Sequence, residues 1–270
     1  MKKALALAPV ALPLSLSAAD APAHIDVSKL PSQSKMIDDV VVPVPSEIFG
    51  VLDKLGPRPN WVAVQRPING VVQPIGEQPQ IALMLGTVIA EGFVAVEAQD
   101  SNQVKQIGKS VLKLSTALAV DKEVKKRAEA ITDAADKKDW PGVRKELDGA
   151  LDDVKRAMLK LNSEALSQLV SLGGWIRGTE ALTAVVSKNY SKDGAELLHQ
   201  PVLLDYFEKR LSTLKPKYKA NTVVTKVQKG VLDIRPLIGL TEDAEISEKS
   251  VGEINQITSD LIKTINSKAP

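Results

Sequence analysis

The sequence predicts an all-α protein: a multi-helix bundle or a stack of helical hairpins, with about eight helices behind a proline-rich, mostly irregular N-terminal segment. Three observations lead to this prediction. The chain is rich in Ala, Leu, Lys and Glu, which favour helix. Aromatic residues make up only 3%, so the core must consist of aliphatic side chains. From Pro79 onward, apolar residues recur at helical spacing, and the links between the apolar stretches are short.

The first 19 residues are typical of a Sec signal peptide. Lys2 and Lys3 form a positive start, an apolar run extends to Leu16, and small residues precede a predicted cleavage after Ala19, or two or four residues later. A retained membrane anchor is the alternative, but the apolar run contains two prolines and is too short to cross ~30 Å of hydrocarbon. We therefore expect a protein of the bacterial periplasm, or a secreted one, with no transmembrane span after cleavage.

Composition and charge exclude several classes of function. Removal of residues 1–19 takes away Lys2 and Lys3 and lowers the formal net charge from +2 to zero. A neutral mature chain gives no reason to expect nucleic acid as a partner. The sequence has no cysteine, which excludes disulfides, thiolate catalysis, cysteine-ligated metals and covalently attached haem. Packing alone must hold the fold, and a domain of this length can achieve that.

Residues 20–78 are expected to be extended, with one short helix. Ser46 can cap that helix at its N-terminus, and Gly56, followed by proline, can end it. Five prolines then fall between residues 57 and 79, where they interrupt two short Val/Ile runs. An Asn-Gly pair between those runs would suit a β-hairpin. Because proline cannot donate to a strand ladder, a long loop laid over the helices is the preferred interpretation.

Residues 79–270 are expected to form one all-helical domain whose breaks have physical causes. Asp139 can cap a helix that tolerates Pro141 in its first turn, and Pro201 can kink or start a helix. The predicted helices span 79–98, 101–118, 121–137, 140–160, 163–188, 193–213, 216–235 and 246–267.

Two of these helices carry charged residues within apolar stripes. The helix at 79–98 is apolar nearly all round, so it is either buried or in a membrane, and Glu91 at its middle favours burial. In the helix at 163–188, Arg177 and Glu180 lie three residues apart on an apolar stripe, where they can touch. Since inward-facing charges must be paired, we predict a cluster of these three side chains.

This predicted cluster, with Trp175 beside it, has two competing interpretations. In the first, Glu91, Arg177 and Glu180 form an internal ion network that only fixes helix register. In the second, the cluster and Trp175 line a small pocket that binds a polar or charged ligand. A third arrangement would turn the charges toward water. A solvent-connected cavity of about 300 Å³ or more that reaches Arg177 would favour the ligand.

The adjacent glycines Gly173 and Gly174 also need a reason, because each mid-helix glycine costs ~1 kcal/mol relative to alanine. A neighbouring helix or a ligand can approach the bare backbone closely there, or the helix can break there. The sequence Leu-Gly-x-x-Ile occurs at residues 85–89 and again at 172–176. Three identities at one offset are equally consistent with chance.

A basic run near the C-terminus is a candidate patch for an anionic partner such as a component of the cell envelope. The preferred alternative is a solvated helix face balanced by acids elsewhere, such as Asp148, Asp152 and Asp153. The cations of the run are Lys209, Arg210, Lys215, Lys217, Lys219, Lys226 and Lys229.

The usual signals of catalysis are missing from the sequence. It has two histidines, His24 and His199, and no zinc-protease, nucleophile-elbow or phosphate-loop motif. We predict no catalytic residue, metal site or cofactor; the alternative is a haem held by His199 and Met84 or Met158. The expected function is a non-enzymatic binding or structural role in the periplasm. A small-ligand sensor or enzyme that uses the Glu/Arg pocket is the alternative.

Overall fold

The computed structural model describes residues 35–37, 40–42, 49–50, 58–239 and 245–268. The fold is all-α, as the sequence predicts, and its helices pack around one core that is mostly aliphatic. The predicted signal peptide and most of the predicted short helix after Ser46 lie outside the described residues. Phe49 and Gly50, which fall within that predicted helix, are helical.

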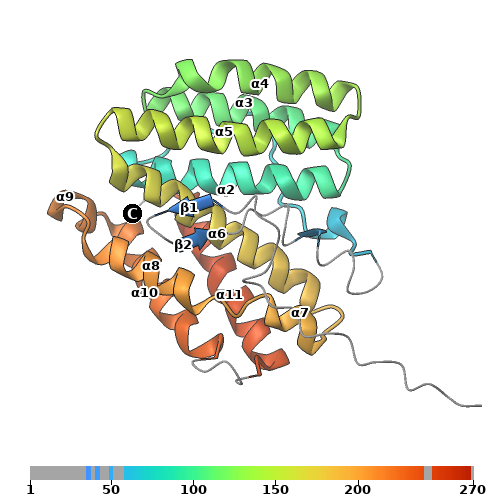
Figure 1. Cartoon of the computed structure of the whole chain (residues 1–270), viewed down its shortest axis with the longest axis vertical. Coiled ribbons are helices and arrows are strands. Elements are labelled where there is room, and N and C mark those ends of the chain that lie inside the picture. Colours follow the sequence, from blue (N-terminus) through green and yellow to red (C-terminus); the bar gives the residue numbers. More distant parts are fainter. Residues whose placement is uncertain (1–34, 38–39, 43–48, 51–57, 240–244, 269–270) are drawn as a thin grey trace, which may run out of the picture.

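The first half of the helical domain is a set of antiparallel helices joined by short links (Figure 1). The side chain of Asp100 caps α3 and that of Asp139 caps α5, each by accepting a bond from a backbone N–H in the first turn. These caps mark the starts of α3 and α5, and the predicted boundaries of all four helices lie within two residues of the observed ones. The four helices are α2 (Gln78–Glu97), α3 (Ser101–Ala117), α4 (Asp121–Asp136) and α5 (Trp140–Lys160).

Each of the four links between consecutive helices, from α2 through to α6, contains a residue whose backbone is in the left-handed conformation. None of these residues is glycine: they are Gln99, Ala119, Lys138 and Asn162, with φ between 53° and 59°. After each turn, a backbone N–H bonds to a carbonyl five residues earlier, as in Asp100 N to Ala95 O at 2.9 Å. This 6→1 bond is the Schellman arrangement, which satisfies carbonyls that the helix end leaves free.

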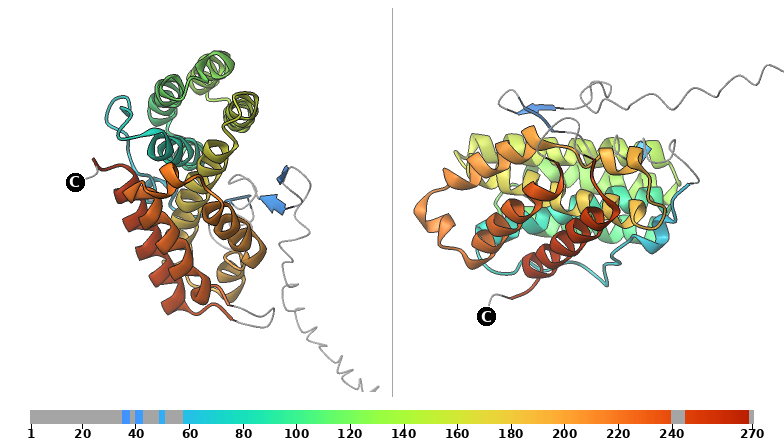
Figure 2. Two further views of the ribbon diagram at one scale, coloured as in Figure 1. Left: turned by 90° about the vertical axis from the view of Figure 1, so that its left-hand side faces the viewer. Right: turned by 90° about the horizontal axis from the view of Figure 1, so that it is seen from below.

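The second half packs below α2, and its longest helix, α6, joins the two halves (Figures 1 and 2). α6 contacts α2 most extensively and also contacts α11, α5 and α8. The elements are α6 (Glu164–Val186), α7 (Lys192–Glu196), α8 (Pro201–Ser212), α9 (Pro216–Lys219), α10 (Thr222–Ile234), a 3-10 turn (Arg235–Leu237) and α11 (Glu248–Ile265).

Two predicted helices are each split in the structure. The segment predicted at 193–213 breaks before Pro201, which begins α8, because proline lacks the N–H that a continuing helix would need. The segment predicted at 216–235 breaks at Asn221, whose side-chain oxygen accepts bonds from the N–H groups of two following residues and so starts α10. A proline at one place and a capping side chain at the other therefore override the apolar periodicity.

The N-terminal part differs from the prediction at one point. Strands β1 (Lys35–Ile37) and β2 (Val40–Val42) pair antiparallel in a short hairpin that we did not predict. The β-branched valines of β2 favour extended backbone. By contrast, residues 58–77 form the predicted loop, with one 3-10 turn at Trp61–Ala63. This loop is bonded to α2 and α3, for example by Val72 N to Ser110 Oγ at 3.0 Å.

The contact between α2 and α6 explains the glycines at 86 and 173. A Cβ atom on Gly173 would overlap the carbonyl oxygen of Leu83, and one on Gly86 would overlap that of Val170. The two Leu-Gly-x-x-Ile segments thus meet each other at the crossing, and α6 runs through residues 172–176 without a break. The bare backbone is needed for the close approach of the two helices.

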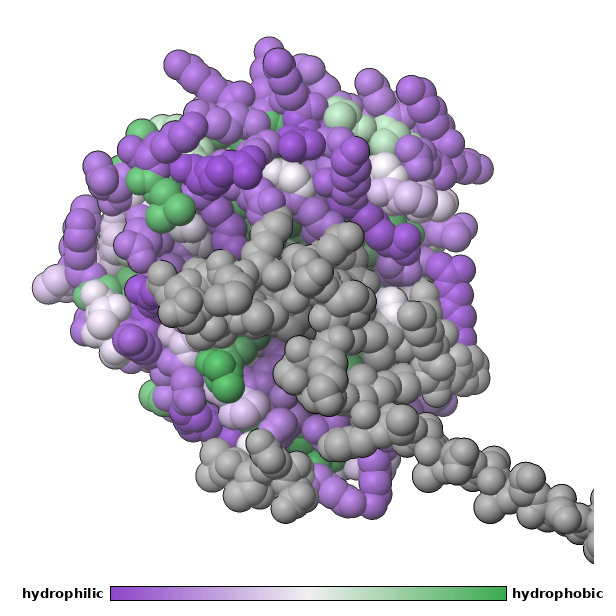
Figure 3. Space-filling model, in the orientation of Figure 1, coloured by the Kyte–Doolittle hydropathy of each residue, from purple (hydrophilic) through white to green (hydrophobic). Residues whose placement is uncertain are grey.

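Helix α2 is enclosed by its neighbours. Within the described part of the chain, α2 alone is long and apolar enough to cross a bilayer. The whole of its most apolar stretch is buried inside the bundle. Burial is the outcome predicted from Glu91. The face of the described residues seen in Figure 3 is mostly hydrophilic, with small, separated apolar areas.

Candidate functional site

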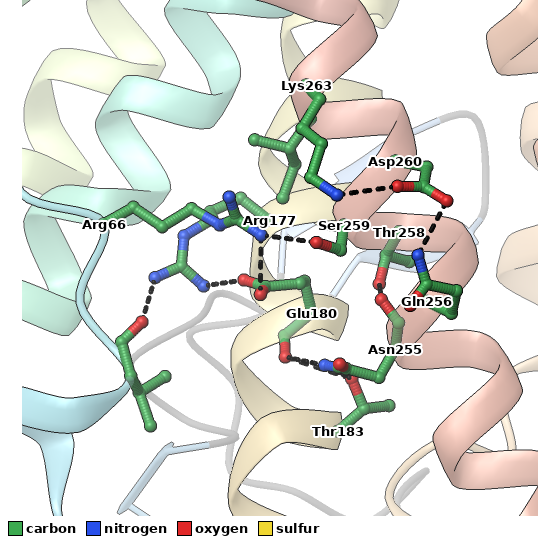
Figure 4. A network of polar contacts seen from close by, with 12 residues as sticks. Arg66, Arg177, Glu180, Thr183, Asn255, Gln256, Thr258, Ser259, Asp260 and Lys263 are labelled. Carbon is green, nitrogen blue, oxygen red and sulfur yellow. Dashed lines mark hydrogen bonds and ion pairs between the residues drawn. The ribbon is translucent and has the colours of Figure 1, made fainter.

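Arg177 is the centre of a buried ion network and is only 1% exposed. Its Nε donates to Glu91 Oε2 at 2.6 Å, and its Nη1 donates to Glu180 Oε2 at 2.6 Å. Its Nη2 donates to the carbonyl oxygen of Val64 at 2.9 Å (Figure 4). The structure thus brings Glu91, Arg177 and Glu180 together, as their helical spacing predicts.

Arg66, from the loop before α2, completes the network and was not predicted. Its backbone N–H donates to Glu91 Oε1 at 2.8 Å. Its Nη2 donates to Glu180 Oε1 at 3.0 Å and to Ser259 Oγ of α11 at 2.8 Å (Figure 4). The sequence did contain a signal: two acids and one base leave a charge of −1, so charge balance required a second cation. Arg66 is one of only two cations between residues 57 and 79.

The network is electrically balanced, and three of its four charged side chains, those of Glu91, Arg177 and Glu180, are buried. Burial raises the pKa of Glu91, while the charge of Arg177 and the N–H of Arg66 oppose that rise. Each of the four carboxylate oxygens of Glu91 and Glu180 accepts a bond from an N–H group. Ionised carboxylates only accept hydrogen bonds, so this arrangement fits two carboxylates facing two guanidinium groups.

Helix α11 supports the network from outside. Asn255 Nδ2 donates to the carbonyl oxygen of Glu180 at 3.1 Å and to Thr183 Oγ1 at 2.9 Å. Thr183 is fully buried. Together with the bond from Arg66 to Ser259, these contacts fix α11 against the charged stripe of α6 (Figure 4). Packing and second-layer hydrogen bonds thus hold the charged side chains in one geometry.

A cavity of about 440 Å³ opens beside this network. Its walls are the loop from Arg66 to Ile75, one face of α2 and the end of α11, and its inner wall includes Glu91 and Arg177. It exceeds the size of about 300 Å³ at which ligand pockets begin. The apolar side chains that line it are Pro67, Ile68, Val72, Ile75, Met84, Val88 and Ile262.

The charged side chains around this cavity are mainly cationic. Arg66, Arg177 and Lys263 line it, against the single acid Glu91. Lys263 is 65% exposed at the rim, where its Nζ lies 2.9 Å from Asp260 Oδ1. Within the described part of the chain, the buried Nε of Arg66 has no hydrogen-bond partner. The cavity thus combines apolar walls with three cations in its lining, while two of their acid partners, Glu180 and Asp260, lie outside the lining.

Trp175 does not belong to this site, contrary to the prediction. It lies two residues before Arg177, and two residues turn a helix by about 200°. Its indole N–H donates to Gln200 Oε1 at 3.2 Å, and its ring lies 5.5 Å from that of Phe207. There it lines a second, mostly apolar cavity of about 50 Å³, with Gly178 on the same wall.

The predicted basic patch lies on α8, α9 and α10, and its six lysines are all exposed. Arg210 differs: it is half-buried, lies 3.5 Å from Glu164 and stands 5.2 Å from the centre of the Tyr206 ring. Lys229 pairs with Asp233. Asp153, one of the acids expected to balance the patch, instead pairs with Arg127 and Arg156.

Sequence reasoning missed a second buried charge. Glu97, at the end of α2, has a side chain only 3% exposed and accepts two bonds from Arg144 of α5, at 2.5 Å and 3.1 Å. Arg58 also donates to the Glu97 carbonyl oxygen at 3.1 Å. The signal available was another acid on an otherwise apolar helix, followed by an arginine on a neighbouring helix. These contacts tie α2 to α5.

The remaining candidates for chemistry show structural contacts. His199 Nδ1 lies 3.0 Å from the carbonyl oxygen of Ile238, and Met84 and Met158 are buried. In the part of the chain that the structure describes, no three His, Asp or Glu side chains are grouped to hold a metal ion. Comparison of the chain with models of protein families, with curated proteins and with solved structures found no match.

Proposed function

We propose that this chain is a non-enzymatic protein that binds a small anion with an apolar body. The observation that carries the proposal is the solvent-connected cavity of about 440 Å³ that reaches Arg177 and Glu91. Ligand sites in proteins are mostly apolar pockets with a few convergent polar groups, and this cavity has that composition.

The charges around the cavity favour an anion over a cation. Arg66 and Lys263 stand at its outer part, and the one acid, Glu91, already accepts bonds on both oxygens. A cationic ligand would find no free carboxylate there. A carboxylate or phosphate could accept from Lys263 and from the partly exposed Arg66 guanidinium, while an apolar tail lay against the wall of aliphatic side chains.

The same pairing argues against catalysis. A general base must be free to take a proton from a substrate. Glu91 and Glu180 are each held by two N–H donors, and Arg177 is held by three acceptors. Groups locked in this way support a binding wall rather than a reacting centre.

The proposed location is the periplasm or the medium. It rests on the N-terminal pattern alone: two lysines, an apolar run and small residues before the expected cleavage after Ala19. Secretion of a fused reporter enzyme, with N-terminal sequencing of the exported product, tests it. A product that starts after Ala19, Ala21 or Ala23 supports the proposal, and a reporter retained in the cytoplasm overturns it.

A series of compounds with one tail and different head groups tests the binding function. We expect hexanoate and hexyl phosphate to raise the melting temperature of the full chain in a dose-dependent way, because ligands that bind the folded state stabilise it. Hexanol and hexylamine should have little effect at equal concentration. Equal shifts with all four compounds would contradict recognition of an anion.

Two variants on α11 provide a matched comparison. Lys263→Glu reverses a charge at the cavity rim, while Lys249→Glu reverses one at the far end of the same helix. Both lysines are exposed and pair with an acid one turn away. Hexanoate should stabilise Lys249→Glu like the wild type and Lys263→Glu at least several-fold less strongly.

A purely structural role is the second candidate, because Arg177 is almost completely buried and all three of its nitrogens are bonded within the protein. In that case the network only fixes the register of α2, α6 and α11. No melting shift with any member of a broader panel of small acids, sugars, haem and metals would favour this role over binding.

A further inference from the structure

A strongly basic region lies on α8, α9 and α10, none of which contributes a residue to the lining of the cavity described above. No acid occurs between residues 209 and 232. Four exposed lysines have no carboxylate within 4.0 Å among the described residues. These are Lys215, Lys217, Lys219 and Lys226. The corner therefore has an excess of positive charge that neighbouring acids do not neutralise.

Helix α9 lies at the edge of the molecule (Figure 1) and contains two of these lysines, Lys217 and Lys219, while Lys215 is its N-cap residue. None of its residues, Pro216–Lys219, is buried. Tyr218 nevertheless packs against the core, and Lys217 Nζ stands 4.9 Å from the centre of its ring. The cations are thus carried on a short, anchored turn that projects from the bundle.

Exposed leucines adjoin these cations. Leu159, in the last turn of α5, and Leu161, the C-cap residue of that helix, are 53% and 52% exposed, whereas the core leucines are almost fully buried. Leu159 lines a hollow of about 410 Å³ together with Lys215 and Tyr218. Leu159, Lys215 and Tyr218 therefore share one surface, and three further exposed residues lie within two positions of them along the chain. We call the whole set the basic corner: Leu159, Leu161, Lys215, Lys217, Tyr218 and Lys219.

We propose that the basic corner binds the surface of an anionic phospholipid bilayer. Lysines near such a surface are attracted by its negative potential, and exposed leucines beside them can enter the boundary of the acyl chains. Tyr218 suits the same membrane interface, because the body of its ring is apolar while its hydroxyl group can stay in water. Lysines alone would fit any polyanion, but nucleic acid offers no apolar layer for the leucines.

Binding of the full chain to lipid vesicles tests this proposal. We expect it to sediment with vesicles of phosphatidylcholine that contain phosphatidylglycerol, and far less with phosphatidylcholine alone. Lys215→Glu/Lys217→Glu/Lys219→Glu should weaken binding by at least about tenfold, given the contribution expected for each lysine near an anionic surface. The control Lys122→Glu/Lys125→Glu/Lys126→Glu makes the same charge change on exposed residues of α4 and should bind like the wild type.

Every variant retains residues 1–19, so any membrane affinity of that segment is common to all of them. Equal vesicle binding by the two triple variants would overturn the proposal, as would failure of the wild type to bind anionic vesicles.

A second pair of changes separates a bilayer from other polyanions. Leu159→Ser/Leu161→Ser leaves the charge unchanged and should lower vesicle binding several-fold, because it removes the apolar contact. The same variant should bind a DNA duplex no differently from the wild type. Vesicle binding that is insensitive to the leucines, or a wild type that binds the duplex more tightly than the vesicles, would assign the corner to a soluble polyanion instead and contradict the proposal.

Discussion

Arg177 of α6 donates to Glu91 of α2 at 2.6 Å, one turn beyond the point where the two helices meet through Gly86 and Gly173. The glycines bring the backbones close together, and the ion pair then fixes which residues face each other. A buried pair of this kind is weak evidence for stability, but it penalises any other register, because a shift would leave a buried charge without a partner. The crossing therefore depends on both packing and charge.

Removal of Arg177 should be strongly destabilising. Arg177→Ala leaves Glu91 and Glu180 buried without their main partner, and we expect the free energy of unfolding to fall by about 3–5 kcal/mol. Arg156→Ala removes an exposed arginine that pairs with Asp153, and its effect should stay within about 1 kcal/mol. Urea unfolding of both variants measures the difference; equal stabilities would show that the network contributes nothing.

The close approach of α2 and α6 predicts opposite effects of alanine at two glycines of one helix. Gly173→Ala should destabilise by about 1–3 kcal/mol, since its Cβ would overlap the carbonyl oxygen of Leu83 and force the helices apart. At Gly178 a Cβ would meet nothing within 4 Å, so Gly178→Ala should gain part of the ~1 kcal/mol helix preference of alanine. Thermal unfolding decides this: a neutral Gly173→Ala would mean that the crossing is looser than the structure has it.

The left-handed backbone conformation of Ala119, in the link between α3 and α4, predicts that glycine at this position would stabilise the fold. Ala119 has φ of 59°, a conformation that is unfavourable by about 1–2 kcal/mol for a residue with a Cβ. Ala119→Gly should therefore raise the free energy of unfolding, whereas Ala130→Gly, inside α4, should lower it by ~1 kcal/mol. Chemical unfolding of the two variants gives the signs, and destabilisation by both would refute the assigned backbone at residue 119.

The buried Tyr206 predicts a pH effect on stability. Burial, with a smaller contribution from Glu164, raises its pKa to about 12, against about 10 in an unfolded chain. Between these values the unfolded state loses the phenol proton while the folded state keeps it, so stability should fall as the pH rises. Tyr206→Phe removes this effect. Urea unfolding between pH 9 and 11 should show the wild type losing stability faster than the variant; parallel losses would contradict the raised pKa.

The helical segments and the charged stripe were predictable because both follow from periodicity. Glu91, Arg177 and Glu180 each stand on an apolar stripe, where burial forces them to find partners. The break at Asn221 was not predicted, because a single side chain that bonds to the backbone interrupts an otherwise regular pattern. The hairpin of β1 and β2 was missed for a similar reason: three-residue strands are too short for a period to appear.

The cavity beside the network could not be predicted from the sequence. Its wall depends on Arg66 and its neighbours in a loop, and loop backbone has no period that places a side chain in space. Trp175 shows the opposite error. Its proximity to Arg177 along the chain suggested that Trp175 joins the cluster. Helical geometry instead places it on the other side of α6, where its ring packs against Phe207.

Calorimetric titration of the full chain with hexanoate tests the central claim most directly. Binding at the cavity predicts one site per chain, with an affinity that falls steeply in Val72→Trp, whose larger side chain would fill the cavity from the loop wall. The account predicts saturable heat in the wild type and in Lys249→Glu, and little or none in Val72→Trp. Equal affinity in the wild type and Val72→Trp, or no heat with the wild type, would contradict it.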